Sequence, residues 1–337
     1  MKIDRPGFLA GSLAVAAALG LRSPAAAARA SEVPQRRLGR TNEMVSVIGL
    51  GGYHLGKPDL TEPESIALMH DAIDRGVTFM DNCWDYNKGE SLLRMGKGLA
   101  AGGYRRRVFL MSKIDGRTKA SAAAQIDQTL KSLQTTHLDL LQFHENIRPN
   151  DADRIFAAGG AFEAVIAAKR AGKIRFIGFT GHKSPAYHLH MIEVARRHGF
   201  TFDTVQMPLN VMDAHYDSFQ QQVLPVANRL DMGVLAMKTF GDPHILDTKA
   251  IDPVTMLHYS MNLPVSVVVT GIDRPEILEQ AIVAAHSFEP LSKAQVSAIL
   301  AKTATLAMDG KTELYKTTTT FDGTTHNPQW LTAATIG

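Results

Sequence analysis

The sequence has little that would cross-link it covalently or attract it to a highly charged partner. It contains one cysteine, Cys83, so an intramolecular disulfide is excluded in any compartment. The net charge of +3 is confined to residues 1–30, which hold four basic residues and one acidic residue. The rest of the chain holds 32 residues of each sign. This balance gives no support for nucleic-acid binding or for attraction to an anionic membrane.

Long apolar runs are also missing after residue 30, so the mature chain is expected to have no membrane span. Residues 1–30 themselves read as a removable leader, with a short basic start, an apolar stretch over 8–20 and a small-x-small cleavage pattern at Ala28-Arg-Ala30. The segment 4–9 resembles a bacterial twin-arginine signal in which Pro6 replaces the second arginine. The leader predicts passage through the export machinery and a periplasmic protein; a cytoplasmic protein is the alternative.

The remaining chain alternates short apolar segments with amphipathic ones. Strand-like segments are predicted at 45–50, 77–82, 108–113, 138–144, 174–180, 204–208, 233–238 and 265–270. Helical segments are predicted near 62–75, 89–101, 118–134, 160–172, 184–199, 215–230, 253–262 and 275–287. Strands rich in Val, Ile, Leu and Phe that alternate with helices indicate parallel βαβ units. Eight such units predict an α/β protein with a (β/α)₈ barrel, and a doubly wound open sheet is the alternative.

The domain organisation follows from this pattern. We expect one barrel domain over residues 35–315, with a small N-terminal β-hairpin near 36–44 and a further helix at 291–306. The Thr-rich tail, residues 316–337, is predicted to be irregular and either to lie over the barrel mouth or to extend freely. The acidic segment 151–154 is interpreted as the solvated start of a helix.

Four polar side chains stand where predicted strands end. Asp81 ends the second strand and Tyr86 follows in its loop, Lys113 ends the third strand, and His144 ends the fourth. Catalytic residues of (β/α)₈ enzymes lie at the C-terminal ends of the strands, so we expect these four to meet at one mouth. Cys83 stands between two of them without a base to activate it, and we interpret it as packing or pocket wall.

These residue types suit proton transfer to a carbonyl group. A tyrosine has a pKa of about 10, and an ammonium group beside it favours the phenolate and lowers that pKa. Tyr86 would therefore donate the proton, Lys113 would tune it, and Asp81 would anchor Lys113. A neutral imidazole at His144 would orient the substrate carbonyl.

Glycines at the end of the first predicted strand resemble nucleotide-binding patterns incompletely. The stretch from Gly51 to Lys57 is close to a phosphate-binding loop, but Pro58 stands where Ser or Thr is needed. The pattern that starts at Gly49 lacks the third glycine of a dinucleotide fingerprint. We interpret these glycines as a close approach of backbone to a ligand, with Gly52 as a candidate cofactor contact.

The same residues resemble a known family. The stretch from Gly76 to Tyr86 and the segment 89–97 resemble the aldo-keto reductase signature, and Lys113 and His144 fall where that family has its lysine and histidine. The similarity runs over about residues 37–285. It implies a (β/α)₈ barrel that reduces aldehydes or ketones with NADPH, with the four strand-end residues as its catalytic set.

The resemblance also implies a cofactor site. Besides Gly52, its expected residues are Thr180, Gln206, Met237, Lys238, Gly271, Arg274 and Gln280. Thr180 replaces a serine that contacts the carboxamide, and Met237 replaces an aromatic residue that stacks on nicotinamide. Arg274 would hold a 2′-phosphate, so we expect NADP(H), with NAD(H) left open.

Two other functions fit parts of the pattern. One is a metal-dependent barrel hydrolase that uses His54, Asp81, His144 and Glu145, although strand one lacks a His-x-His pair and no metal site is expected. The other is a non-catalytic nicotinamide-binding barrel that acts as a sensor or a regulatory subunit.

Overall fold

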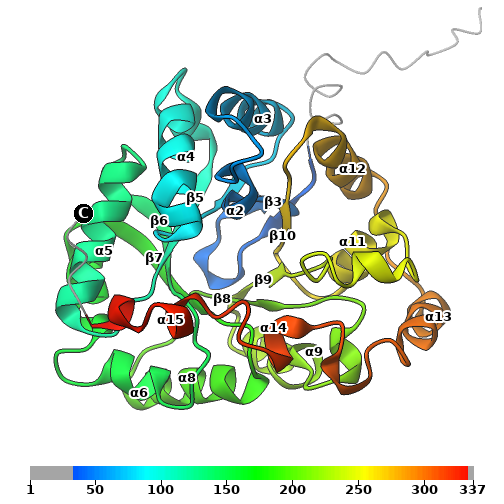
Figure 1. The fold of residues 1–337 in the computed structure, drawn as a ribbon. Coiled ribbons are helices and arrows are strands. Elements are labelled where there is room, and N and C mark those ends of the chain that lie inside the picture. The colour runs from blue at the N-terminus through cyan, green and yellow to red at the C-terminus, as the bar shows by residue number, and fades with distance from the viewer. Residues whose placement is uncertain (1–32, 333–337) are drawn as a thin grey trace, which may run out of the picture. The chain divides into compact units, whose positions relative to one another are not determined.

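The computed structural model describes residues 33–332, so the predicted leader (1–30) lies outside the described residues. Eight parallel strands form a closed barrel surrounded by helices (Figure 1). The strands are β3 (Ile48–Gly51), β4 (Phe79–Asp81), β5 (Phe109–Ile114), β6 (Leu138–Phe143), β7 (Ile174–Thr180), β8 (Thr204–Pro208), β9 (Gly233–Met237) and β10 (Val267–Gly271). They pair in chain order, and β10 pairs with β3 to close the ring. The predicted (β/α)₈ barrel is confirmed, and the open sheet is excluded.

The N-terminal hairpin is formed by β1 (Gln35–Arg37) and β2 (Met44–Ser46), which pair antiparallel. The predicted strand 45–50 is therefore wrong in its extent, because its first residues belong to the hairpin. Ser46 makes the corner: its hydroxyl donates to the carbonyl of Ile48 (2.6 Å) and accepts from the N–H of Thr78 (2.9 Å). The apolar run over 45–50 is thus divided between β2 of the hairpin and β3 of the barrel.

The barrel interior is filled at the hairpin end. A buried cluster joins side chains of the strands to two side chains of the hairpin. Its members are Leu38, Val45, Phe79, Phe109, Met111, Leu140, Leu235, Val267 and Val269. A packed floor of this kind leaves space for a ligand only at the C-terminal ends of the strands, as is usual for this architecture.

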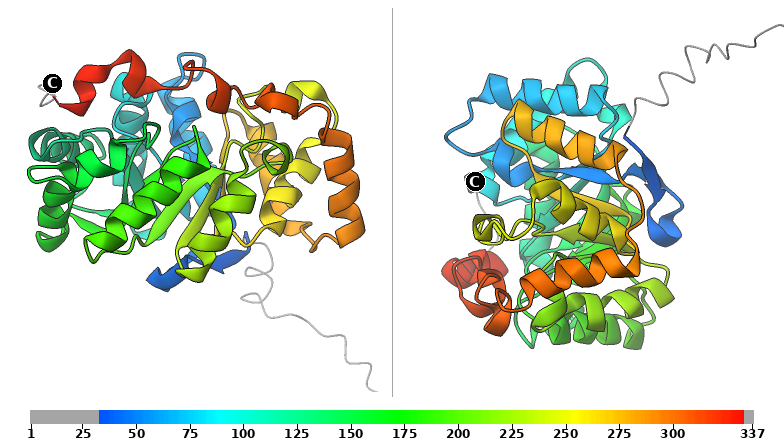
Figure 2. Two further views of the ribbon diagram at one scale, coloured as in Figure 1. Left: turned by 90° about the horizontal axis from the view of Figure 1, so that it is seen from below. Right: turned by 90° about the vertical axis from the view of Figure 1, so that its right-hand side faces the viewer.

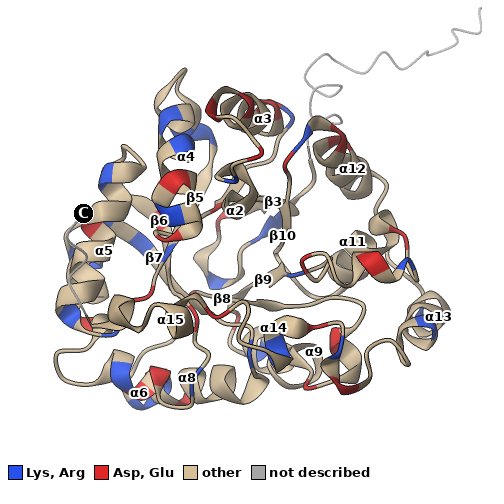
Figure 3. Cartoon of the chain, in the orientation of Figure 1, with Lys and Arg blue, Asp and Glu red and all other residues tan. Residues whose placement is uncertain are grey.

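The helices in chain order are α2 (Gly52–Leu55), α3 (Glu62–Asp74), α4 (Glu90–Ala100), α5 (Lys119–Ser132), α6 (Asp151–Phe156), α7 (Ala161–Arg170), α8 (Pro185–Arg197), α9 (Phe219–Gln222), α10 (Leu224–Arg229), α11 (Pro253–Asn262), α12 (Pro275–His286), α13 (Lys293–Thr303), α14 (Leu314–Thr317) and α15 (Gly323–His326). Their starts follow local chemistry; Thr61, for example, caps α3 in a reciprocal capping box with Glu64. Both signs of charge are interspersed over the helices (Figure 3). Within residues 33–332 no helix combines the length and apolar character needed to cross a membrane.

Two helix expectations need correction. The single helix predicted near 215–230 is two short helices, α9 and α10, and Pro225 stands in the first turn of the second. Asp151 is not solvated: it is fully buried at the start of α6 and accepts from Nε of the equally buried Arg117 (3.0 Å). A charged pattern in the sequence cannot distinguish a solvated acid from one with a buried partner.

The C-terminal segment, residues 308–332, crosses the end of the barrel opposite to the hairpin (Figures 1 and 2). Its position is fixed by hydrogen bonds to loops that follow the strands. Glu145 accepts from the N–H groups of Gly323 and Thr324, both at 2.7 Å. The N–H of Arg117 donates to the carbonyl of Leu331 (2.8 Å). The described part of the Thr-rich tail therefore lies over the mouth.

A buried ion-pair network anchors the start of this segment. Nζ of Lys316 donates to Asp213 (2.8 Å), to Glu313 (3.0 Å) and to the carbonyl of Tyr216 (2.7 Å). Replacing Lys316 by methionine leaves two buried carboxyl groups without their cation. We expect Lys316→Met to lower the free energy of unfolding by about 3–5 kcal/mol, measured by urea unfolding.

The matched control is Lys97→Met. Lys97 pairs with Glu62 at 2.6 Å, but the two side chains are 49% and 37% exposed. This change should cost less than about 1 kcal/mol because exposed ion pairs contribute little. Equal losses in the two variants would contradict the role assigned to the buried network.

Candidate active site

Adjacent parallel strands bring the four predicted catalytic residues to one end of the barrel. Asp81 is the last residue of β4, Lys113 lies one residue before the end of β5, and His144 directly follows β6. Tyr86 starts the short helical turn Tyr86–Gly89 after β4. Because β4, β5 and β6 are neighbours in the sheet, their C-terminal ends place these side chains together.

Lys113 is the centre of the group. It is buried and forms an ion pair with Asp81, and its ammonium also donates to the carbonyl of Asn82 (3.0 Å) and to the hydroxyl oxygen of Tyr86 (3.3 Å). Gln206 donates from Nε2 to the second oxygen of Asp81 (2.7 Å). All three ammonium hydrogens have an acceptor, so the phenol oxygen of Tyr86 accepts and its own hydrogen is free to be donated elsewhere.

The expected lowering of the tyrosine pKa is wrong for this structure. Burial raises the pKa of Tyr86 well above its ordinary value, and the carboxylates of Asp81, Asp85 and Asp115 raise it further, as does Cys83. Lys113 is paired with Asp81, and the pKa of Tyr86 is raised overall. Tyr86 is therefore held as a phenol, which is the form that can donate a proton.

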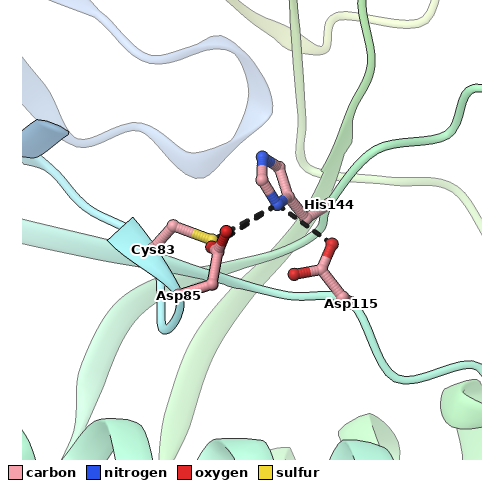
Figure 4. A group of neighbouring side chains, drawn as sticks. All are labelled: Cys83, Asp85, Asp115 and His144. Carbon is pink, nitrogen blue, oxygen red and sulfur yellow. Dashed lines mark hydrogen bonds and ion pairs between the residues drawn. The ribbon is translucent and has the colours of Figure 1, made fainter. Parts of the chain in front are cut away.

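His144 lies between Tyr86 and a buried group of acceptors. Its ring packs edge-on against the ring of Tyr86, with centroids 5.9 Å apart. Its Nδ1 atom is 3.0 Å from Oδ1 of Asp115, 3.9 Å from Oδ1 of Asp85 and 3.3 Å from Sγ of Cys83 (Figure 4). Burial lowers the pKa of His144, but Asp115, Asp85 and Glu145 outweigh it, and the pKa is raised overall. The neutral imidazole expected from the sequence is therefore disfavoured.

A cavity of about 730 Å³ opens beside these residues. Most of the predicted site residues line it, namely Tyr86, Lys113, His144, Thr180, Met237, Lys238, Gly271, Arg274 and Gln280. The other three predicted residues, Asp81, Gln206 and Gly52, do not line the cavity. A Cβ at Gly52 would lie 2.5 Å from the carbonyl oxygen of Asp81, so this glycine allows α2 to pack against the end of β4. The C-terminal segment completes the wall with residues such as Phe321 and His326.

The cavity has the groups that a nicotinamide dinucleotide requires. The buried hydroxyls of Thr239 and Thr270 line it and have no hydrogen-bond partner. Lys57, Lys238 and Arg274 also line the cavity. Lys238 and Arg274 have only long contacts with Asp242 (3.8 Å) and Asp273 (3.7 Å), so phosphate groups could bind to these cations. Unsatisfied polar atoms together with clustered cations fit a ligand that combines amide, hydroxyl and phosphate groups.

Sequence reasoning missed several residues that shape the site. Trp84 donates from its indole N–H to Asp115 (2.5 Å), and Arg117 donates to the carbonyl oxygens of Asp115 and His144, both at 2.8 Å. Glu145, which the sequence suggested only as a residue of the metal-hydrolase alternative, holds the C-terminal segment. Each of these residues follows the end of a strand within a few positions, and this placement was the feature of the sequence that could have marked them as site residues.

The residues that a metal-dependent hydrolase would need do not gather around one point in the structure. Asp81 is engaged by Lys113 and Gln206, and Glu145 by the C-terminal segment. Among residues 33–332, the metal-binding residue types that gather closely are those around Nδ1 of His144, a group that contains neither Asp81 nor Glu145. Cys83 belongs to this buried group and does not line the cavity, which corrects its interpretation as pocket wall.

Known proteins resemble the chain in sequence and in fold. The uncharacterized oxidoreductase YrpG of Bacillus subtilis is 30% identical over 220 residues, which are 59% of this chain and 64% of that protein. L-galactose dehydrogenase of Arabidopsis thaliana is 30% identical over 160 residues, which are 45% of this chain and 49% of that protein. The matched region thus spans 64% and 49% of the length of these two relatives.

The holo form of aldo-keto reductase AKR11C1 from Bacillus halodurans superposes with a TM-score of 0.67 at 18% identity, and the match covers 80% of this chain and 96% of that one. Residues 47–256 match the family model described as Aldo/keto reductase family. The chain belongs to the aldo/keto reductase family.

Proposed function

We propose that the protein reduces an aldehyde or a ketone to an alcohol by hydride transfer from NADPH, with Tyr86 as the general acid. The observation that carries this proposal is the orientation of the tyrosine. Its oxygen accepts a hydrogen bond from Lys113, which is fixed by Asp81, and Tyr86 lines the cavity. The phenol hydrogen is therefore available to a ligand in that cavity.

The cofactor would be held by residues along the cavity wall. Thr180 and Met237 would contact the nicotinamide end, and Lys238 and Arg274 would bind phosphates. The bound cofactor supplies the hydride. Gln206 would have a second part, because its amide N–H donates to Asp81 (2.7 Å) and steadies the ion pair. Its Oε1 has no hydrogen-bond partner, so the expected contact with the cofactor stays a prediction.

The protein's own contribution is to hold and move one proton. Tyr86 and His144 would both donate hydrogen bonds to the carbonyl oxygen of the substrate, which polarises the C=O bond. When negative charge develops on this oxygen, the Tyr86 proton is transferred to it and the product hydroxyl forms. The ammonium of Lys113, 3.3 Å from the phenol oxygen, stabilises the phenolate left behind.

The first prediction tests the acid. Tyr86→Phe should lower kcat by about 10²–10⁴-fold because the proton donor is lost, and cofactor affinity should change by less than about twofold. Carbonyl-dependent NADPH oxidation and fluorescence titration with NADPH measure these quantities. Tyr104→Phe is the control, because Tyr104 stacks on His70 away from the cavity. Retained turnover in Tyr86→Phe would refute the assignment.

A second prediction concerns the cofactor. Arg274 lines the cavity with a side chain that is 63% exposed, and its contact with Asp273 is long (3.7 Å), so a 2′-phosphate could compete for the guanidinium. Arg274→Ala should weaken NADPH binding by about tenfold or more and leave NADH binding nearly unchanged, because one charge-assisted contact is lost. Isothermal titration with both nucleotides measures the ratio, and Arg107→Ala, at the other end of the barrel, is the control. Equal weakening of both nucleotides would contradict the role.

We propose further that residues 1–30 direct export to the periplasm and are then removed. The support is the basic start, the apolar stretch and the cleavage pattern of the sequence. N-terminal sequencing of protein from the periplasmic fraction should find Ser31 as the first residue. Protein that keeps Met1 and stays in the cytoplasm would refute export.

A further inference from the structure

The surroundings of Nδ1 of His144 are unusual because two carboxylate oxygens and a sulfur atom lie close to it. Oδ1 of Asp115 and Oδ1 of Asp85 are 3.0 Å and 3.9 Å away, and Sγ of Cys83 is 3.3 Å away. Both carboxylate oxygens are buried, and within the described residues neither accepts a hydrogen bond from any group apart from this ring. Figure 4 shows the imidazole directed into this group. Two buried carboxylate oxygens beside one ring nitrogen favour a positive charge on that ring.

The protonation of the ring can be derived from these contacts. A neutral ring with its proton on Nε2 would turn the lone pair of Nδ1 toward Asp115 at 3.0 Å, where the two lone pairs repel. A neutral ring with its proton on Nδ1 would leave Nε2 as an acceptor, unable to donate to a carbonyl oxygen. Sγ of Cys83 donates to the carbonyl of Lys113 (3.6 Å), which leaves the sulfur to accept from Nδ1. The doubly protonated imidazolium is therefore the form that satisfies the carboxylates and also donates into the cavity.

Asp115 and Asp85 are not equivalent as counter-ions. Burial and the charge of Asp115 raise the pKa of Asp85 to about 6, so this carboxyl gains a proton as the pH falls. Burial also acts to raise the pKa of Asp115, but His144, Arg117 and the hydrogen bond from Trp84 outweigh it and the pKa is lowered. Asp115 therefore keeps its charge over the range in which His144 titrates.

We propose that Asp115, held in place by Trp84, is a positioning residue that keeps His144 as an imidazolium, so that Nδ1–H faces the carboxylate while Nε2–H donates to the substrate carbonyl. This inference rests on the proposed function for its catalytic meaning. Trp84 fixes the carboxylate because its indole N–H donates to Oδ2 of Asp115 at 2.5 Å, and its ring packs edge-on against Trp330.

The charged and titratable groups that face His144 come from three loops. They are Cys83, Asp85 and Tyr86 after β4, Lys113, Asp115 and Arg117 at and after β5, and Glu145 beside it. The two cations are already paired, Lys113 with Asp81 and Arg117 with Asp151. The acidic groups therefore decide the direction, and the pKa of His144 is raised overall. The imidazolium is present below the raised pKa and is lost as the pH rises through it.

The direct test follows the ring of His144 by NMR in the full chain with labelled histidine, assigned by comparison with His144→Gln. In wild type the ring should titrate above the ordinary value of about 6.5. In Asp115→Asn, which keeps the shape and removes the charge, the pKa should fall by about 1–3 units. Asp153→Asn is the matched control, because Asp153 pairs with the surface His190 at 2.8 Å. It should leave His144 unchanged.

The pH profile of carbonyl reduction adds the functional readout. Wild-type kcat/KM should fall as the pH rises through the pKa of His144. In Asp115→Asn this fall should occur at a lower pH, displaced by as much as the pKa of His144 in the NMR titration. At pH values below the lowered pKa, the variant should keep its activity. A loss of the same size at every pH would show that Asp115 is merely structural and would overturn the proposal.

Three further results decide the case. If Asp115→Asn does not fold, Trp84→Phe should shift the titration of His144 in the same direction by a smaller amount. An unchanged titration in the folded variants, or a stoichiometric metal ion found on Nδ1 in the purified protein, would overturn the proposal. If the wild type reduces no carbonyl compound, the proposed function fails, but the NMR titration still tests the His144–Asp115 pair.

Discussion

The buried ion pair between Lys113 and Asp81 is the interaction on which the site depends. Two opposite charges out of contact with water are tolerated only when their remaining hydrogen bonds are satisfied. Here Gln206 satisfies the carboxylate, and Asn82 and Tyr86 satisfy the ammonium. Tyr86 therefore contributes to the burial of a charge as well as to the proposed chemistry, and its orientation follows from that requirement.

A second pair, His144 and Asp115, stands beside the first and is built differently. The first pair fixes its cation with three acceptors, whereas the second surrounds one ring nitrogen with acceptors and leaves the other nitrogen facing the cavity. The residues of both pairs lie at or just after the C-terminal ends of β4, β5 and β6, which are neighbours in the barrel. The scaffold thus places Tyr86, which is backed by the first pair, and His144, which belongs to the second, around one position where the oxygen of a carbonyl group would gain negative charge.

Sequence reasoning predicted the barrel and the residues at its strand ends because both leave local signals. A buried parallel strand is a short apolar run, and Asp81, Lys113 and His144 stand at the ends of such runs. The role of Asp115 could not be predicted in this way. It lies only two residues beyond Lys113, but its meaning comes from Trp84 and His144, whose loops meet it only in the folded barrel. Asp151 was misjudged for the same reason, since its partner Arg117 lies 34 positions away.

The route of the C-terminal segment has a consequence for how the protein is made. Glu145 sits next to His144, and its hydrogen-bond partners, Gly323 and Thr324, are 178 and 179 positions further along the chain. A chain still emerging from the ribosome can close the barrel and form the Lys113–Asp81 pair before these partners exist. The cavity wall is completed by a segment that follows the last barrel strand, β10, in the chain. Binding of a ligand that needs this wall therefore has to wait until residues up to Thr324 have been synthesised and have packed over the mouth.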